Sequence, residues 1–286
     1  MKQLLVISGK GGTGKTTLVS SMIQLGGFEA FADCDVDAPN LALVTKLKQE
    51  PITNDYYGMD KVRINKDKCV GCRKCYDLCR FDAIEEDGLQ YKVNPYHCEG
   101  CGLCEYACPQ EAIEYVKNVA GYTYVYDEDR YLSSACLKMG EGNSGLLVTK
   151  VKENLKESDA PIAIIDGAPG IGCPVIASIS AVDEVIIVTE PSLSGLSDLK
   201  RIVKMVRNNK LNPYIVINKY DVNVQKCEDI EAYLKEEGLI LIGKIPFEKT
   251  CHSYLKQGLS LVESKSVASN VIKDMHGKML RKLKGE

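Results

Sequence analysis

Two groups of residues have the types and spacing of chemical sites: a glycine-rich loop near the N-terminus and two runs of closely spaced cysteines. The loop spans Gly9 to Thr17, and its residues Gly9 to Thr16 fit the pattern G-x-x-x-x-G-K-T between an apolar run and a helical pattern. Glycines let successive backbone N–H groups surround phosphate oxygens, and the N-terminus of the following helix adds a favourable field. The loop therefore predicts a phosphate site, with a ligand-free glycine turn as the alternative.

The side chains of the loop have distinct expected tasks. Lys15 is expected to reach the β- and γ-phosphates of a nucleotide, and the Thr16 hydroxyl is expected to hold Mg²⁺. The expected nucleotide-binding residues of the loop are Gly9, Gly11, Gly12, Thr13, Gly14, Lys15, Thr16 and Thr17.

A second lysine in the loop carries a family resemblance. With Lys10, the stretch KGGTGKT resembles the deviant loop of MinD/Mrp-type ATPases and of the nitrogenase iron protein. The resemblance implies an ATPase that dimerises with itself or with a similar chain. Lys10 would then cross to the nucleotide of the partner subunit and stabilise charge on the transferring phosphoryl group. A lysine solvated on its own loop is the alternative.

Two acidic positions extend this resemblance. Asp35 matches the residue that orients the attacking water in that family, with Asp33 and Asp37 as further candidates, and Asp166 matches the residue that holds Mg²⁺ through water. Asp35 and Asp166 each follow a predicted strand, and ligands bind at the carboxyl ends of parallel strands. The alternative is that these acids cap the next helix.

The nucleotide base is specified by a more ambiguous pattern. Asn218, Lys219 and Asp221 follow a strand pattern in the order N-K-x-D, which reads guanine in GTPases. Related ATPases use an asparagine at this position for adenine, and Pro246 resembles their purine-packing segment. We therefore expect ATP, with GTP as the alternative.

The two cysteine runs share the spacing C-x2-C-x2-C-x3-C. Each matches the bacterial ferredoxin run, in which three cysteines hold one iron–sulfur cube and the fourth reaches the other cube. The stretch resembles a two-cluster bacterial ferredoxin, although Arg80 replaces the proline that usually follows the fourth cysteine. The resemblance implies two 4Fe-4S clusters. Their ligands would be Cys69, Cys72, Cys75 and Cys108 for the first cluster, and Cys98, Cys101, Cys104 and Cys79 for the second.

Other uses of these cysteines fit the pattern less well. Zinc would be satisfied by two C-x-x-C pairs and would not need the additional cysteines. Disulfides are disfavoured in a reducing cytosol. A cluster pair with a purely structural role stays open, because ligation alone does not prove electron flow.

Five cysteines lie outside the runs: Cys34, Cys136, Cys173, Cys227 and Cys251. Most of them are expected to be small buried apolar side chains. Cys173 stands where the nitrogenase iron protein has a cysteine that binds a cluster shared between subunits, and Cys136 stands near the position of the other ligand. The resemblance implies a third, inter-subunit cluster, and an inert thiol is the alternative.

These sites need elements that position them. Apolar runs without alternation predict strands covered on both faces; they include Gln3–Ser8, Pro161–Asp166, Glu184–Thr189 and Tyr214–Asn218. Helical patterns alternate with the strands, which predicts a mostly parallel α/β sheet. We therefore predict a P-loop NTPase domain in two parts, residues 1–58 and 119–286, with a small α+β ferredoxin-like domain inserted at residues 59–118.

Composition excludes several classes of protein. The chain has 286 residues, of which 45% are hydrophobic and 26% charged, as in globular proteins. The formal net charge of −3 provides no basic field for nucleic acid. No apolar run could span a bilayer and no cleavage site follows the N-terminal run, so we expect a cytoplasmic protein. Val267–Lys284 predicts a helix packed on the sheet, with a basic membrane-binding tail as the alternative.

Together these features predict a dimeric ATPase that couples its nucleotide state to electron transfer through two 4Fe-4S clusters, as in an ATP-dependent reductase component. One alternative is a scaffold or carrier ATPase for the assembly of iron–sulfur clusters or metallocofactors. Another is a positioning ATPase with a sensor module. The expected partners are a similar chain and either a redox protein or an apo-protein acceptor.

Overall fold

The computed structural model describes residues 1–45, 47, 49–127, 130–249, 254 and 259–286, which form two compact units. The larger unit comprises Met1–Thr53, Thr123–Cys136 and Ser144–Glu286, and the smaller unit comprises Asn54–Tyr122 and Leu137–Asn143. The segment Leu137–Asn143, which the sequence analysis assigned to the second part of the NTPase domain, thus belongs to the smaller unit.

The elements follow the chain in this order. The strands are β1 (Lys2–Ser8), β2 (Ala30–Asp33), β3 (Ile52–Tyr57), β4 (Lys61–Ile64), β5 (Ile84–Asp87), β6 (Gln90–Val93), β7 (Ile113–Val116), β8 (Val119–Asp127), β9 (Tyr131–Leu137), β10 (Ile162–Pro169), β11 (Glu184–Thr189), β12 (Tyr214–Asn218) and β13 (Ile240–Ile245). The helices are α1 (Lys15–Leu25), α2 (Leu41–Val44), α3 (Lys74–Leu78), α4 (Leu103–Ala107), α5 (Ser144–Leu155), α6 (Cys173–Ile179), α7 (Leu193–Asn208), α8 (Val224–Glu236), η1 (Leu261–Glu263) and α10 (Val267–Lys284).

A mostly parallel sheet forms the centre of the larger unit. Within the described residues it has nine strands in the order β13-β12-β11-β1-β10-β2-β9-β8-β3. β1 pairs in parallel with β10 and β11, and the parallel pairing continues outward to β13 on one side and β9 on the other. Parallel pairing brings the carboxyl ends of these strands to one edge, where ligands bind in such sheets.

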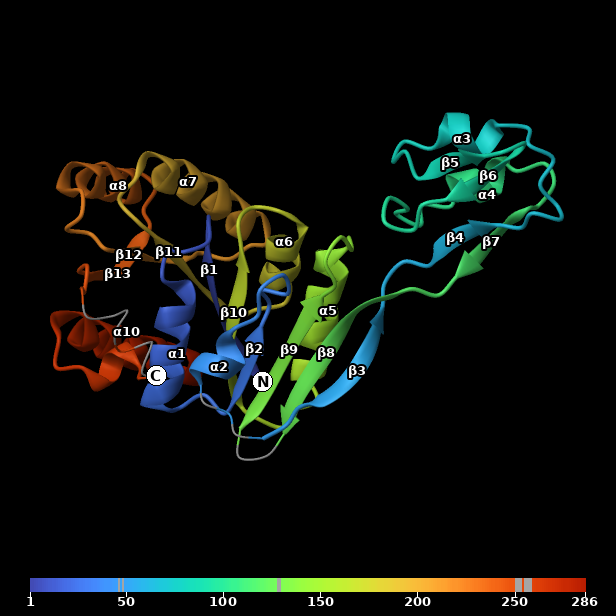
Figure 1. Cartoon of the computed structure of the whole chain (residues 1–286). Helices are drawn as coiled ribbons and strands as arrows, with labels where there is room; N and C mark the ends of the chain where they lie inside the picture. Colours follow the sequence, from blue (N-terminus) through green and yellow to red (C-terminus); the bar gives the residue numbers. More distant parts are fainter. Residues whose placement is uncertain (46, 48, 128–129, 250–253, 255–258) are drawn as a thin grey trace. The chain divides into compact units, whose positions relative to one another are not determined.

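Helices cover both faces of this sheet. Leu4 and Val6 of β1 belong to a core cluster with α1 and α10, which lie side by side in Figure 1. Leu5 and Ile7 are also fully buried and, by strand alternation, point to the opposite face. Burial on both faces explains why these strands appear in the sequence as continuous apolar runs.

The smaller unit is built by an internal repeat with pseudo-twofold symmetry. The constant offset that relates Cys69 to Cys98 also relates β4 to β6 and β5 to β7. β4 pairs antiparallel with β7, and β5 pairs antiparallel with β6. The β4–β7 sheet and the β5–β6 sheet, both seen in Figure 1, are thus equivalent to each other. In the β4–β7 sheet, one strand comes from each half of the repeat, so the two halves are interleaved.

The C-terminal segment forms the long helix α10, as the sequence predicts. Its apolar side chains Ile272, Met275, Met279 and Leu283 are buried in the core cluster. The apolar face is therefore covered by the sheet and α1 and does not form a membrane-binding tail. In the described part of the chain, no helix is long and apolar enough to cross a membrane.

The sequence analysis did not predict every strand. The patterns for β11 and β12 coincide with the observed strands, whereas β3, β8 and β9 were not predicted. β3 has the sequence ITNDYY and is almost wholly exposed, and it lies at the end of the strand order. An edge strand has no continuous apolar run, because much of its surface stays in water.

Gly167 provides a test of the packing between β1 and β10. A Cβ at Gly167 would lie 2.4 Å from Ile7 Cγ2 and 3.0 Å from the Val6 carbonyl oxygen. We expect Gly167→Ala to lower the free energy of unfolding by about 1–3 kcal/mol, the usual cost of overpacking. Thermal unfolding of the larger unit measures this change.

Gly277→Ala in α10 is the matched control, because the nearest atom to its added Cβ is Arg281 Nη1 at 3.8 Å. Alanine favours a helix over glycine by about 1 kcal/mol, so this variant should be as stable as the parent chain or more stable. Equal stability of the two variants would contradict tight packing at Gly167.

Candidate functional site

The glycine-rich loop joins β1 to α1, and its backbone needs glycine at two positions. Gly12 and Gly14 have positive φ angles of 77° and 92°. A Cβ at Gly14 would lie 2.3 Å from Asn218 Nδ2, so a side chain is also excluded by space. The first turn of α1 has no acidic residue and no side-chain cap. Its N–H groups are therefore open to an anion.

Lys15 and Thr16 both contact Asp166, and the sequence analysis assigned all three residues to the phosphate and Mg²⁺ site. Lys15 Nζ lies 2.5 Å from Asp166 Oδ1, and Thr16 Oγ1 donates to Asp166 Oδ2 at 2.6 Å. Asp166 is fully buried and Lys15 is 5% exposed. The β1–β10 register places Asp166 opposite Val6, just before the loop begins. The structure thus brings together the three side chains expected to act on phosphate and Mg²⁺.

Asp33 is buried and shapes the segment that follows β2. Its Oδ1 accepts a hydrogen bond from the Asp35 N–H at 3.1 Å, and its Oδ2 accepts from the N–H groups of Asn40 and Leu41, each at 2.9 Å. Burial, with the neighbouring Asp166 carboxylate, raises the pKa of Asp33 to about 7. These contacts indicate that Asp33 orders the backbone.

Asp35 has different surroundings. It is half-buried, and burial raises the pKa of its carboxyl group. The positive charge of Lys15 lowers that pKa and the Asp166 carboxylate raises it, so Asp35 is close enough to both for their charges to act on it. Asp37 is exposed. Among the three aspartates, Asp35 is the one that combines partial exposure with nearness to the phosphate-site charges.

Lys10 is held within its own chain. Its Nζ lies 2.5 Å from Glu190 Oε1 and donates to Ser194 Oγ at 3.2 Å and Ser192 Oγ at 3.4 Å. The other oxygen of Glu190 lies 3.4 Å from Lys219 Nζ. The two lysines lower the pKa of Glu190 against the opposing effect of burial. One carboxylate thus holds two lysines beside the glycine-rich loop.

The sequence analysis missed Glu190, although a signal was present. Glu190 directly follows β11, whose bounds the sequence predicts, so the strand-end argument used for Asp166 applies to it as well. No sequence pattern indicates that Asp198 lies close to the loop. A Cβ at Gly9 would lie 2.3 Å from Asp198 Cβ, which only the packing of α7 against the loop reveals.

A cavity of about 330 Å³ adjoins the loop and contains most of the expected base-site residues. Its lining includes Gly12, Gly14, Thr17, Asn218, Lys219, Ile245, Pro246 and Phe247. Asn218 Nδ2 donates to the Thr13 carbonyl at 2.7 Å, and Lys219 Nζ donates to the Gly12 carbonyl at 3.1 Å. Both side chains therefore join the base cavity to the phosphate loop.

Asp221 does not line this cavity. Its Oδ1 accepts a hydrogen bond from the Phe247 N–H at 2.7 Å, and Tyr220 N–H donates to the Ile245 carbonyl at 3.2 Å. These bonds tie the segment after β12 to the segment after β13. The Asp221 carboxylate thus holds the Pro246–Phe247 wall of the cavity.

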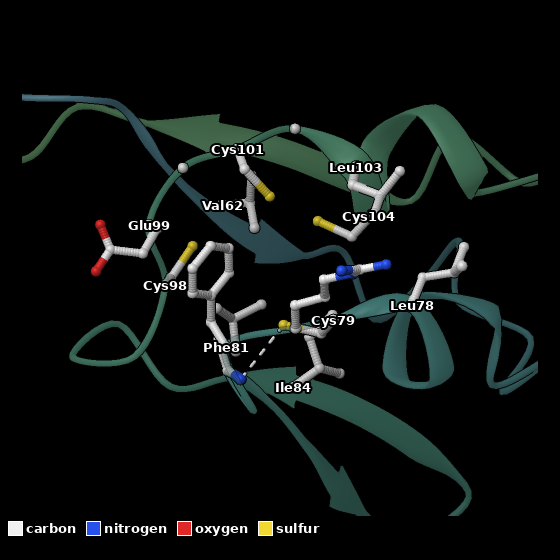
Figure 2. A pocket seen from close by; sticks show the side chains of 15 residues that line it. Val62, Leu78, Cys79, Phe81, Ile84, Cys98, Glu99, Cys101, Leu103 and Cys104 are labelled. Carbon is white, nitrogen blue, oxygen red and sulfur yellow. Dashed lines mark hydrogen bonds between the residues drawn. The ribbon is translucent and has the colours of Figure 1, made fainter.

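The eight run cysteines divide between two cavities of the smaller unit. One cavity of about 270 Å³ is lined by Cys79, Cys98, Cys101 and Cys104, whose positions around it are visible in Figure 2. A second, of about 20 Å³, is lined by Cys69, Cys72, Cys75 and Cys108. We call them the Cys98 cavity and the Cys69 cavity. Each contains three cysteines of one run and the fourth of the other, the grouping that the resemblance implies.

The backbone around the cysteines fits iron–sulfur ligation. The Ala83 N–H donates to Cys79 Sγ at 3.4 Å, and the Ala112 N–H donates to Cys108 Sγ at 3.3 Å. Such bonds to sulfur are one of the protein's means of tuning a cluster. Gly100 has a positive φ, and its Cβ would lie 2.4 Å from the Asp60 carbonyl oxygen, so the loop between Cys98 and Cys101 needs glycine.

The two cavities differ in size. The Cys98 cavity encloses about 270 Å³, whereas the Cys69 cavity encloses about 20 Å³. Burial raises the pKa of the Cys104 thiol to about 11, so iron must displace its proton on binding. Within the described residues, no three His, Cys, Asp or Glu side chains are close enough to bind a single metal ion.

The remaining cysteines have different environments. Cys34 and Cys227 are buried, Cys136 is half-buried near the end of β9, and Cys173 is exposed at the start of α6. A Cβ at Gly145 would lie 3.2 Å from Cys173 Cβ, so the first turn of α5 packs against this cysteine. Cys251 lies outside the described residues.

Comparisons with known proteins agree with both parts of the chain. Residues 62–115 match the family model described as a 4Fe-4S dicluster domain. The protein MJ0578 of Methanocaldococcus jannaschii is 34% identical over 280 residues, covering 97% of this chain and 96% of that protein. A protein of Pyrococcus horikoshii named iron-sulfur cluster carrier protein is 23% identical over 307 residues, and the alignment covers 99% of this chain and 86% of that protein.

Solved structures give the fold of the larger unit. The septum site-determining protein MinD of Pyrococcus horikoshii, complexed with Mg-ADP, superposes with a TM-score of 0.59 at 18% identity, covering 97% of this chain and 95% of that chain. The chain therefore has a MinD-like P-loop fold with an embedded 4Fe-4S dicluster domain.

Glu190 provides a test of the phosphate-site charges. Because its carboxylate neutralises Lys10 and Lys219, we expect Glu190→Gln to bind ATP and ADP more tightly, by up to about fivefold. Isothermal titration calorimetry at low and high salt measures the effect, which should shrink as salt screens the charges. Glu237→Gln, just after the end of α8, loses an ion pair with Arg207 of α7 and is the control. Unchanged or weaker nucleotide binding in Glu190→Gln would contradict the argument.

The smaller unit should depend on iron for its fold. A buried apolar cluster of this unit consists of Cys75, Ile84 and Tyr91, and such a small cluster provides little burial for a stable small domain. We expect chelation of iron to make residues 54–122 exchange amide hydrogens freely, while β1 and β10 stay protected. Hydrogen–deuterium exchange with mass spectrometry measures both regions in one sample. Continued protection of residues 54–122 in iron-free protein would refute this dependence.

Proposed function

Since this chain belongs to the same family as MJ0578 and joins a MinD-like P-loop fold to a 4Fe-4S dicluster domain, we propose that it is an ATP-driven carrier of iron–sulfur clusters. The observation that carries the proposal is the presence, in one chain, of a complete phosphate site and two four-cysteine cavities. This choice favours the carrier alternative over the electron-transfer function that the sequence analysis placed first.

The relatives support the carrier function. The Pyrococcus horikoshii protein of that name aligns along 99% of this chain, so the likeness extends through the P-loop unit. In the proposed role, the eight run cysteines hold two resident 4Fe-4S clusters. The transferred cluster is a separate cargo, which the P-loop unit binds and releases according to its nucleotide.

The geometry of the base cavity supports ATP as that nucleotide. In the N-K-x-D order, guanine recognition needs a free aspartate to accept from the base. Here Asp221 accepts from the Phe247 N–H and lies outside the cavity lining. Asn218 and Lys219 are the residues of the motif that line the cavity close to the loop. Lys15 and Thr16 would bind the phosphates and Mg²⁺, and Asp35 would orient water for hydrolysis.

Dimerisation is part of the proposal. Lys10 is 36% exposed in its side chain and is held only by residues at the surface of its own chain, so a second phosphate group can compete for it. Leu193, next to those residues, is 78% exposed. We propose that two copies, or this chain and a similar one, associate over this edge of the sheet and exchange Lys10.

Cys173 is the proposed cargo ligand. It is exposed at the first position of α6, directly after the chain leaves Asp166 and β10. Ile171 and Ile176 around it are 40% and 53% exposed, so its surroundings suit contact with another subunit. In a dimer, two copies of Cys173, with Cys136 as a second ligand, would hold the cargo between the subunits.

Electron transfer is the second candidate, and one observation favours it. Each run cavity offers four cysteines, and backbone N–H groups bond to the fourth sulfur of each run. Complete thiolate ligation keeps a cluster bound, and such hydrogen bonds tune its potential. Clusters held this way suit repeated oxidation and reduction better than release.

A transfer assay separates the two functions. Anaerobic protein, loaded with iron and sulfide and mixed with an apo-ferredoxin acceptor and ATP, should pass one cluster while its resident clusters stay bound. Cys173→Ser should lose at least about tenfold in transfer rate, because a hydroxyl is a poor iron ligand. Its resident iron content should be unchanged. Cys227→Ser, which alters a buried cysteine hydrogen-bonded to Glu231, is the control.

Transfer that is unaffected by Cys173→Ser would refute the cargo role. If no cluster is transferred while the clusters reduce reversibly with an ATP-dependent potential, the electron-transfer function is correct instead.

Nucleotide choice has its own test. We expect ATP to bind at least about tenfold more tightly than GTP, as measured by calorimetry with Mg²⁺ present. Asp221→Ala should weaken both nucleotides to a similar degree, because it loosens the Pro246–Phe247 wall without removing a base contact. A selective loss of GTP binding in Asp221→Ala would show that Asp221 reads guanine.

A further inference from the structure

The segment Leu137–Asn143, here called the return segment, lies between β9 and α5 and belongs to the smaller unit. The Lys138 N–H donates to the Ala120 carbonyl at 2.8 Å, which fixes the start of the segment to β8. Three glycine or asparagine residues, Gly140, Gly142 and Asn143, give the rest of the segment little intrinsic stiffness. Among the side chains of the segment, Lys138 Nζ lies 5.1 Å from the centroid of the Tyr122 ring, and the one acidic side chain, Glu141, forms an ion pair further along the segment.

Glu141 is bound by two partners in the smaller unit. Its Oε1 lies 2.9 Å from Lys61 Nζ, and its Oε2 accepts from Asn118 Nδ2 at 2.9 Å. The side chains of Lys61 and Glu141 are only 11% and 14% exposed. By contrast, in the ion pair between Lys66 and Asp87 of the same unit, the two side chains are 42% and 49% exposed. A buried pair defines one geometry far better than an exposed pair does.

The contacts of Lys61 and Gly142 extend to the segment that carries Cys98 and Cys101. Lys61 Nζ also donates to the Pro95 carbonyl at 2.6 Å, in the segment that enters Cys98. A Cβ at Gly142 would lie 2.8 Å from Glu99 Oε2, and Glu99 lines the cavity, as Figure 2 shows. Glu141 and Gly142 therefore support the backbone that carries Cys98 and Cys101.

The other end of the return segment continues into the nucleotide unit through the peptide bond between Asn143 and Ser144. Ser144 begins α5, and its neighbour Gly145 packs against Cys173 at the start of α6. α6 follows β10, whose Asp166 binds Lys15 and Thr16. A shift of Asp166 on nucleotide binding would thus reach the first turn of α5 through a short series of packed elements.

We propose that Glu141 is a positioning residue that couples the nucleotide state to the Cys98 cavity through the return segment. The carboxylate ties the segment to Lys61 and Asn118, and α5 pulls on its other end when α6 moves. Of the partners of the return segment named above, Glu99 lines the Cys98 cavity, and none lines the Cys69 cavity. The nucleotide therefore acts on one cluster site and not on its pseudo-symmetric counterpart. This inference rests on the proposed function, since it assumes a bound nucleotide and resident clusters.

The internal repeat provides the measurement. Hydrogen–deuterium exchange of the iron-loaded chain, with and without a non-hydrolysable ATP analogue, compares residues 94–104 with the equivalent residues 65–75. We expect the analogue to change exchange at least about twofold in residues 94–104 and to leave residues 65–75 unchanged. The same samples, examined by electron paramagnetic resonance after reduction, should show a nucleotide-dependent change in one cluster signal.

Two variants test the route by different means. Glu141→Ala removes the ion pair and should abolish the response of residues 94–104. Insertion of two glycines between Gly142 and Asn143 keeps every Glu141 contact but slackens the connection to α5, and should also abolish it. Asp87→Ala is the control, because it removes an exposed ion pair in the same unit.

The outcomes distinguish this inference from the proposed function. Calorimetry and iron analysis first establish that each variant binds the nucleotide analogue and retains its clusters; failure of the parent chain in either would overturn the proposed function. A full response in the insertion variant, or an equal response in residues 65–75 and 94–104 of the parent chain, would overturn the coupling route. If Glu141→Ala loses its clusters, the insertion variant alone decides.

Discussion

The buried contact between Lys15, Thr16 and Asp166 is the interaction on which the larger unit's chemistry depends. Asp166 is fully buried and has two polar partners, both from the loop that joins β1 to α1. In a medium of low dielectric such a charge needs partners, since leaving it unpaired would cost several kcal/mol. The parallel pairing of β1 with β10 holds the two sides of this contact in register. A nucleotide that binds here must draw Lys15 and Thr16 toward its phosphates, so Asp166 is necessarily affected by its arrival.

The same carboxyl edge of the sheet gathers the other charged groups. Glu190 holds Lys10 and Lys219, and Asp33 orders the segment that presents Asp35. Glu190 directly follows β11, and Asp33 is the last residue of β2. Each of these lysines is already paired within the chain, so a phosphate group that binds here must compete with an internal carboxylate for it.

The smaller unit depends on a different constraint, the interleaving of two equivalent halves. Because β4 pairs with β7, the fourth cysteine of each run reaches the cavity of the other run. Neither half could complete a four-cysteine cavity alone. The two halves differ at equivalent positions of the repeat. Arg80 in the first half corresponds to Pro109 in the second, and Val70 corresponds to Glu99. The return segment approaches Glu99 through Gly142 and pairs with Lys61 through Glu141, so the two cysteine cavities have different surroundings despite their common origin in the repeat.

The sequence by itself determined the local patterns: the glycine-rich loop, the run cysteines and their division, the repeat, and the buried strands β11 and β12. These follow from residue type and spacing over a few positions, which is where backbone geometry and ligand chemistry act. Tertiary structure alone decided the strands β3, β8 and β9, the contacts of Lys10 with Glu190, and the attachment of Glu141 to the smaller unit. Each of these joins residues far apart in the chain, and an exposed strand or a paired charge has no periodicity that would reveal its partner. The chain's chemistry could therefore be inferred from short motifs, whereas the connection between its two kinds of site required the folded molecule.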